Sequence, residues 1–292
     1  FVGLGRKKSL GVFENMTPLI RISDKIYAKF EAYQPTGSVK DRMVSYLVDH
    51  AVRNNLIVPG LTKFIEATSG NTGISLASQA AKYNCPCQII MPQNMSEQRK
   101  QMMRAFGAVI IEVGDNDFKG AIALRDEIIR KSKKYEIWCP YQFSNQLNVE
   151  CHYKTTADEI CSQVTDMRER WDVFVHGAGT GGTMMGVKKY IDHHDLGIKC
   201  VLTMPAESSA THGIQGINDG ADFLLDRNLM DNVVRVETSE AIERMQRFAR
   251  ETGLLVGISS GANIIAAEAY ADMFKPEGIV ITILCDRGER YL

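Results

Sequence analysis

The sequence has no surplus of charge of either sign. Its 34 Lys and Arg residues nearly balance 35 Asp and Glu residues over 292 positions, and both signs are mixed along the whole length. No basic face therefore argues for a nucleic acid or a membrane surface as a partner. A small molecule is the partner that this composition favours.

Long apolar runs and paired cysteines are also missing. No stretch reaches the roughly 18 residues of a membrane-spanning helix, and residues 1–10 lack the hydrophobic region of a signal peptide. The seven cysteines are an odd number without Cys-x-x-Cys spacing, which disfavours a disulfide framework and a zinc site. Cys85 and Cys87 are interpreted as buried or turn cysteines. We expect free thiols, a cytoplasmic protein and no metal.

The sequence does contain an alternation of helical periods with short β-branched runs, which favours parallel βαβ units and an α/β fold. The chain is long enough for two such lobes. A hairpin is expected over 19–30. Later strands are expected at 64–67, 88–91, 109–113, 172–176, 199–204, 233–236 and 279–284. Helices are expected from Lys40 onward and at 74–83, 96–106 with Ser96 as N-cap, 119–134, 156–164, 239–252 and 262–273.

One lysine stands in an unusual setting. Residues 35–42 read Pro-Thr-Gly-Ser-Val-Lys-Asp-Arg, which places Lys40 in a turn of small residues at the start of a helix. A lysine held in this way can form an imine with a carbonyl compound. Taken alone, Lys40 is more often a solvated charge at a helix start.

Two strand-to-helix loops and one cysteine are further candidates. The glycine-rich loop 177–183 would let backbone N–H groups and a helix N-terminus approach a phosphate, although a dinucleotide loop or a structural turn would also fit. Residues 68–73 offer hydroxyls, a carboxamide and N–H groups to a carboxylate, although helix capping explains each polar residue singly. Cys285 follows an apolar strand, where it either faces a ring or is buried at the strand end.

Together these motifs resemble the fold-type II pyridoxal-phosphate (PLP) enzymes, specifically the cysteine synthase (O-acetylserine sulfhydrylase) family, over essentially the whole chain. The matching motifs are Thr17-Pro18-Leu19, 35–42, 68–73, Gln142-Phe143, 152–156, 179–183, 257–261 and 288–291. Residues 91–96 and 285–288 look more like the B-type isozyme, whereas 213–217 look more like the A-type. The resemblance implies a two-domain, tryptophan synthase β-like fold of mostly parallel twisted sheets flanked by helices.

The resemblance also implies domains and residue roles. A smaller, mobile N-terminal domain would comprise 35–145 with 1–12, and a larger C-terminal domain 146–292 with the 13–34 hairpin, with PLP in the cleft between them. Lys40 would be the Schiff-base lysine and later the acid and base at Cα. The cofactor would be held by Lys40, Asn71, Gly179, Thr180, Gly181, Gly182, Thr183 and Cys285. The substrate would be bound by Thr68, Ser69, Gly70, Asn71, Thr72, Gln142 and Gly213.

The implied reaction is β-replacement of O-acetyl-L-serine, or O-phospho-L-serine, by sulfide to give L-cysteine through an aminoacrylate. The chain lacks the arginine pair that B-type isozymes carry after Pro-Gly-Ile, which favours sulfide over thiosulfate and weakens O-phosphoserine. A cystathionine β-synthase-type reaction, a serine or threonine dehydratase, and a silent homologue that binds PLP or a partner protein stay open. A homodimer and binding of the C-terminal peptide of serine acetyltransferase are implied by the family alone.

Overall fold

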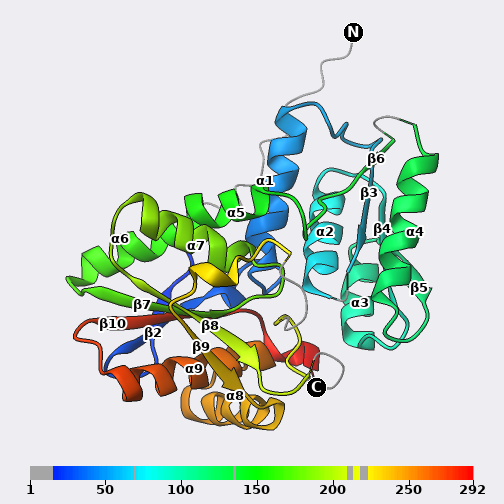
Figure 1. Cartoon of the computed structure of the whole chain (residues 1–292). Coiled ribbons are helices and arrows are strands. Elements are labelled where there is room, and N and C mark those ends of the chain that lie inside the picture. Colours follow the sequence, from blue (N-terminus) through cyan, green and yellow to red (C-terminus); the bar gives the residue numbers. More distant parts are fainter. Residues whose placement is uncertain (1–15, 69, 134–135, 209–212, 218–222, 292) are drawn as a thin grey trace.

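Two mostly parallel sheets lie side by side in the computed structural model, which describes residues 16–68, 70–133, 136–208, 213–217 and 223–291 (Figure 1). The larger sheet has the order β1-β2-β10-β7-β8-β9, with strands Leu19–Arg21, Ile26–Phe30, Ile279–Leu284, Trp171–Gly177, Lys199–Pro205 and Asn232–Val236. The smaller has the order β5-β4-β3-β6, with strands Val109–Val113, Cys87–Pro92, Lys63–Ala67 and Ile137–Trp138. Among these strands only β1 pairs antiparallel. The predicted α/β fold class is confirmed.

Helices cover both faces of each sheet. Figure 1 shows α6 and α7 on one face of the larger sheet and α8 and α9 on the other, while α2 and α4 flank the smaller sheet. The helices are α1 Lys40–Arg53, α2 Asn71–Lys82, α3 Glu97–Ala105, α4 Phe118–Lys131, α5 Leu147–His152, α6 Asp158–Met167, α7 Gly182–His193, α8 Thr238–Thr252 and α9 Ile258–Phe274. A π-helical stretch, Tyr153–Ala157, joins α5 to α6, and 3-10 turns span Glu31–Tyr33, Arg227–Leu229 and Gly288–Tyr291.

The predicted strands lie within one residue of the observed ends, but several helix predictions are wrong. Helix α2 begins at Asn71 rather than 74, and α9 begins at Ile258 rather than 262, because their first turns consist of small and hydroxyl residues that fit a loop equally well. The helix expected at 156–164 is part of a longer run from Leu147 to Met167. Helix α4 ends at Lys131, before the expected 134. Ser96 precedes α3 but makes no capping bond; its hydroxyl donates to the Arg290 carbonyl at 3.4 Å.

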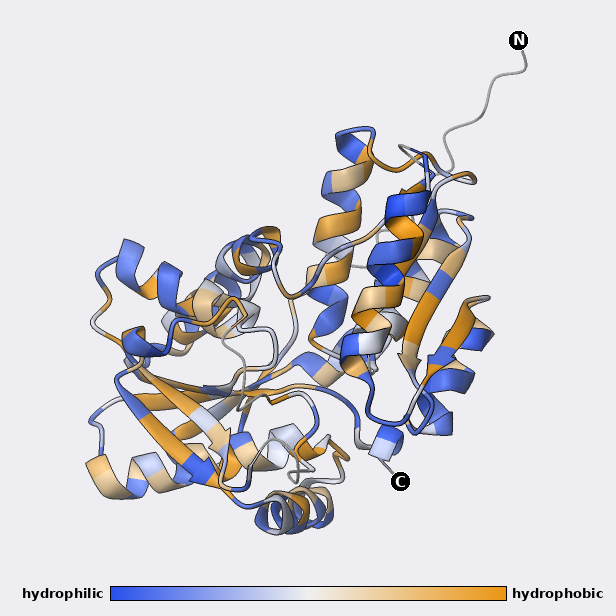
Figure 2. Cartoon of the chain, turned by 45° about the vertical axis from the view of Figure 1, so that its right-hand side comes forward, coloured by the Kyte–Doolittle hydropathy of each residue, from blue (hydrophilic) through white to orange (hydrophobic). Residues whose placement is uncertain are grey.

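Each sheet has its own apolar core. Fully buried Phe64, Ile74 and Ile89 fill the space between the smaller sheet and its helices. Phe174 and Ile281 belong to the core of the larger sheet. Figure 2 shows the strands mostly in hydrophobic colours and many outward helix faces in hydrophilic ones. The assignment of 35–145 and 146–292 to separate domains remains a prediction.

A buried ionic cluster ties the start of α1 to the larger sheet. Arg42, on the first turn of α1, donates to Glu31 at 2.7 Å and to Glu159 of α6 at 2.5 Å. Lys29 of β2 lies 2.8 Å from the same Glu159 carboxylate. Burial would raise the pKa of Glu31, but the adjacent Arg42 guanidinium outweighs it and holds that pKa at about 2. These opposite charges fix the position of the helix that begins at Lys40.

Two histidines are buried as neutral groups. His152 of α5 lies 2.8 Å from the Thr156 hydroxyl through Nδ1 and 3.2 Å from the Thr183 hydroxyl through Nε2. His176 of β7 lies 3.2 Å from the side-chain amide of Asn263. Burial lowers the pKa of each imidazole to about 3. Both are therefore uncharged in the folded protein at neutral pH.

Replacing Arg42 by methionine should destabilise the fold strongly. Glu31 would be left as a buried carboxylate without its main counter-charge, a change that costs about 3–5 kcal/mol. Urea unfolding of the cofactor-free protein measures this loss. The control is Arg104→Met, which removes an exposed pair with Glu97 and should cost less than about 1 kcal/mol. Equal losses in the two variants would show that the ionic cluster does not hold α1.

The two buried histidines predict a loss of stability in mild acid. Below pH 6.5 an unfolded histidine takes up a proton that the folded protein does not accept until about pH 3, so this contribution is complete above pH 6.5 and falls as the pH falls. Each histidine should lower the free energy of unfolding by about 2 kcal/mol between pH 7 and pH 5. In His152→Asn and in His176→Asn the decrease in unfolding free energy from pH 7 to pH 5 should be smaller by about 2 kcal/mol than in the parent protein, as measured by urea unfolding at both pH values. An unchanged pH dependence in both variants would contradict the assignment.

Candidate active site

Lys40 is presented by a turn that is anchored at both ends. The backbone N–H of Val39 donates to the carbonyl of Cys285 at 2.8 Å, which joins the turn to the end of β10. Gly37 has a φ of +82°, the left-handed conformation that glycine adopts without strain. The carboxylate of Asp41 accepts from the Thr36 backbone N–H at 2.9 Å and from the Ser75 hydroxyl at 2.5 Å. The start of α1 is thereby held in one orientation.

The amine of Lys40 has an altered ionisation. Burial lowers its pKa, and the nearby Cys285 and Asp286 act in the opposite direction without reversing the change. In the described part of the chain no carboxylate forms a salt bridge with this amine. Lys40 is therefore neutral over a wider pH range than a solvated lysine, which a nucleophile or a proton acceptor requires.

A cavity at Lys40 collects most of the residues expected to hold a cofactor. It is lined by Lys40, Asn71, Gly179, Thr180, Gly181, Thr183 and Cys285. Gly182, which was expected with them, is not among the lining residues and forms the first position of α7. The roles given to these residues remain predictions.

The glycine-rich loop has the shape of an anion site. Gly181 has a φ of +88° just before α7 begins, so the loop borders the cavity at a helix N-terminus, a position that favours an anion. A Cβ on Gly179 would lie 2.5 Å from the carbonyl oxygen of Gly216, and one on Gly181 would lie 2.5 Å from the backbone nitrogen of Leu225. Both positions therefore require glycine. A phosphate suits this concave backbone.

Cys285 ends the apolar run of β10 and borders the cavity. Its backbone N–H donates to the Ser260 hydroxyl at 2.9 Å, and its sulfur accepts from the amide of Asn263 at 3.5 Å. Burial, helped by the charge of Asp286, raises the pKa of the thiol to about 12. The cavity thus presents an uncharged thiol next to the lysine.

Asn71 borders the cavity, and both polar atoms of its side-chain amide make hydrogen bonds within the protein. Its Nδ2 donates to the Asp286 carboxylate at 2.6 Å, and its Oδ1 accepts from Arg290. Tyr291 also donates to Asp286. These contacts define which way the amide points, so the expected bond to a ring hydroxyl would have to share Nδ2 with Asp286. That bond remains a prediction.

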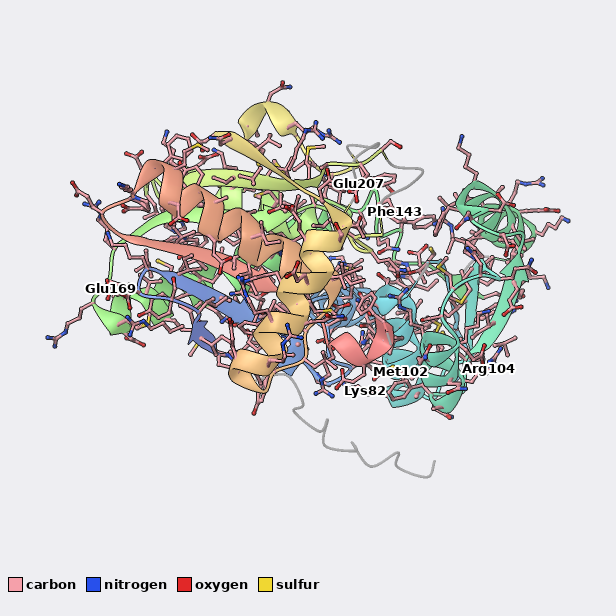
Figure 3. All side chains as sticks on the ribbon, turned by 90° about the horizontal axis from the view of Figure 1, so that it is seen from below. Lys82, Met102, Arg104, Phe143, Glu169 and Glu207 are labelled. Carbon is pink, nitrogen blue, oxygen red and sulfur yellow. The ribbon has the colours of Figure 1, made fainter. Side chains whose placement is uncertain are left out.

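The other expected substrate residues gather at the start of α2. Thr72 donates to the side-chain oxygen of Gln142 at 2.6 Å, and the Thr68 hydroxyl accepts from the Gly70 N–H at 3.3 Å. These four residues do not line the cavity itself. Ser69 lies outside the described residues. Figure 3 shows Phe143, which follows Gln142, between the parts of the molecule built on the two sheets.

Gly213 was expected to bind the substrate, and that role remains a prediction. Its N–H donates to the Thr238 hydroxyl at 2.9 Å, and it is not a lining residue, whereas the nearby Gln215 and Gly216 are.

The sequence interpretation gave no role to nine lining residues, four of which carry polar side chains: His176, Gln215, Ser259 and Asp286. A signal for two of them was present. His176 and Asp286 stand at the carboxyl ends of β7 and β10, which are neighbouring parallel strands, and ligands of parallel sheets bind at that edge. Ser259 and Gln215 stand in the segments 257–261 and 213–217, which carried the family resemblance, although neither residue was given a role.

These residues fit PLP by their chemistry: a half-buried lysine with a lowered pKa for its aldehyde, a glycine-rich loop for its phosphate and a neutral thiol for its ring. A family profile described as "Pyridoxal-phosphate dependent enzyme" matches residues 12–286. A cysteine synthase of Staphylococcus aureus is 35% identical over 294 aligned residues, which are 94% of this chain and 92% of the relative.

Solved structures show the same similarity. A hydrogen sulfide-producing enzyme from Fusobacterium nucleatum has a TM-score of 0.86 at 35% identity and covers 94% of this chain and 96% of its own. An O-acetylserine-dependent cystathionine β-synthase from Helicobacter pylori has a TM-score of 0.86 at 32% identity and covers 95% and 94%. The lysine at the cavity, the glycine-rich loop and these matches lead to one conclusion: the chain belongs to the family of pyridoxal-phosphate-dependent enzymes that includes the cysteine synthases.

Proposed function

We propose that this PLP-dependent β-replacement enzyme is a cysteine synthase, which replaces the acetate of O-acetyl-L-serine with sulfide. The observation that carries the proposal is the cavity bordered by the Lys40 amine with its lowered pKa, the glycine-rich loop and the neutral Cys285 thiol. The cysteine synthase relatives support this choice among PLP reactions.

Several residues would hold the cofactor. Lys40 would bind the aldehyde carbon of PLP, and the loop 179–183 would bind its phosphate. Cys285 would face the ring nitrogen, and Asn71 would donate a hydrogen bond to the ring hydroxyl. When bound, PLP supplies an electron sink for the negative charge that develops at the substrate Cα. An uncharged thiol at the ring nitrogen would leave that nitrogen unprotonated and moderate the sink, which suits elimination at Cβ better than transamination.

Side chains of the protein would then transfer the Cα proton and bind the substrate. The neutral amine of Lys40 would take the proton from Cα and return it after sulfur has added at Cβ. Thr68, Ser69, Asn71, Thr72 and Gln142 would bind the substrate carboxylate. Movement of the smaller lobe onto the larger would exclude water from the reactive carbon.

The charges around the cavity support an acetyl rather than a phosphoryl leaving group. Among the described residues, those that line the cavity include no arginine, and Lys40 is the one lysine. Outside the lining, Arg104 pairs with Glu97 on the surface. Arg99 lies 4.7 Å from the centre of the Tyr291 ring, and a Cβ on Gly70 would lie 3.0 Å from its Cδ. A phosphate ester carries a negative charge that an acetate ester lacks, and no arginine among the described lining residues would face that charge.

Assembly, location and protein partners are proposals from the family alone. We infer a homodimer, a cytoplasmic location and an interaction with the C-terminal peptide of serine acetyltransferase. Among the described residues no helix is long and apolar enough to cross a membrane.

A second candidate keeps the first substrate and changes the nucleophile. The similar Helicobacter pylori structure is an O-acetylserine-dependent cystathionine β-synthase, so a thiol such as homocysteine could replace sulfide at the same cavity. The same first half-reaction would serve both nucleophiles.

The test is turnover by the PLP-loaded protein. O-acetyl-L-serine should change the visible absorption of the bound cofactor, and sulfide should restore it with release of L-cysteine. Lys40→Ala should lower kcat by about 10²–10⁴-fold, because it removes the acid and base at Cα. The exposed Lys154→Ala serves as a control and should retain activity. Homocysteine acting in preference to sulfide would select the second candidate, and no response to O-acetylserine would overturn both.

A further inference from the structure

A buried ion pair lies behind the segment that carries Gln142. Glu66 of β3 has no exposed surface, and its Oε1 lies 2.8 Å from the guanidinium of Arg125 on α4. Its other oxygen accepts from the backbone N–H of Gln142 at 3.2 Å. Burying two charges is costly unless they are paired and hydrogen-bonded. The pair therefore needs an explanation beyond packing, since apolar side chains could fill the same space.

The path of the chain supplies that explanation. Strand β6 pairs with β3 only through Ile137 and Trp138, so the next residues leave the sheet without a strand to accept their N–H groups. A buried N–H without an acceptor costs about 1–3 kcal/mol. The carboxylate of Glu66 takes the place of the missing strand. Burial raises the pKa of Glu66, and the adjacent Arg125 guanidinium opposes that rise without reversing it.

Arg125 also holds the residue before Gln142. Tyr141 has a φ of +49°, a left-handed conformation that is unfavourable for an aromatic residue. The Arg125 guanidinium lies 5.0 Å from the centre of the Tyr141 ring, within the range of a cation–π contact. One arginine thus fixes both the turn and the carboxylate on which the turn rests.

The remaining polar atoms of Gln142 are held as well. Its carbonyl accepts from Asn148 at 3.0 Å, and its side-chain oxygen accepts from Thr72 at 2.6 Å. In the described part of the chain its amide nitrogen, Nε2, has no hydrogen-bond partner. The Nε2 donor is therefore held in place by the contacts of the backbone N–H, the carbonyl and the side-chain oxygen of Gln142. It lies next to the start of α2 and could donate to one oxygen of a carboxylate.

We propose that Arg125 and Glu66 are a positioning pair that aims the Gln142 amide at the substrate carboxylate. This inference rests on the proposed function, because it assumes a substrate with a free α-carboxylate. Arg125 and Glu66 touch no substrate themselves; they act through the backbone of Gln142.

The test compares ligands with and without the carboxylate. The PLP-loaded protein is titrated with O-acetyl-L-serine and with its carboxamide, and the change in visible absorption gives an affinity for each. Arg125→Met should weaken O-acetyl-L-serine about tenfold, the size expected for one misplaced hydrogen bond to a charged group, and leave the carboxamide within twofold. KM should rise by the same factor while kcat stays within twofold. Arg125→Lys should restore most of the affinity, because it keeps a charge beside Glu66.

The controls separate this inference from folding and from the proposed function. Lys131→Met, which removes an exposed pair with Glu127 on the same helix, should leave both affinities unchanged. If Arg125→Met lowers the unfolding free energy of the cofactor-free protein but leaves the ratio of the two affinities unchanged, the pair is structural only and the inference is wrong. Should Arg125→Met not fold, Arg125→Lys must still show a smaller shift in the same ratio. A parent protein that does not respond to O-acetyl-L-serine would instead overturn the proposed function.

Discussion

The site depends on one backbone connection, the bond from the Val39 N–H to the carbonyl of Cys285. It joins the turn before α1 to the carboxyl end of β10, so the lysine on the helix and the thiol on the strand border the same cavity. The adjacent bridge between Ser38 and Asp286 extends this contact by one residue on each side. Burial of the Lys40 amine, and hence its lowered pKa, follows from that junction.

Buried charges around the site position backbone rather than take part in chemistry. Arg42 fixes the start of α1 through Glu31 and Glu159, and Arg125 fixes the Gln142 turn through Glu66. In both clusters an arginine compensates a carboxylate that has no access to water, so neither partner can move without a large cost. The closure proposed for the smaller lobe would therefore involve movement of whole elements, with these side chains held in place.

Sequence patterns predicted the strands well, because buried parallel strands such as 279–284 are short apolar runs bounded by turns. They also indicated Lys40 and the glycine-rich loop as candidates, because a lysine in a turn of small residues and a run of glycines between a strand and a helix can both be recognised from neighbouring residues alone. The starts of α2 and α9 were missed, since Asn71, Thr72 and Ser259 suit a loop as well as a first turn. Strand β6 was missed because it has only 2 residues. The engagement of Asn71 by Asp286 and Arg290 joins positions more than 200 apart, which no local pattern predicts.

The most direct test of the account asks which lysine binds the cofactor. The PLP-loaded protein is reduced with borohydride, digested and analysed by mass spectrometry, so that a pyridoxyl group stays on the lysine that held PLP. The account predicts the label on the peptide that contains Lys40, with none on the exposed Lys154. A label on another lysine, or no stable label on a protein that has taken up PLP, would contradict the assignment of Lys40 and the cavity built around it.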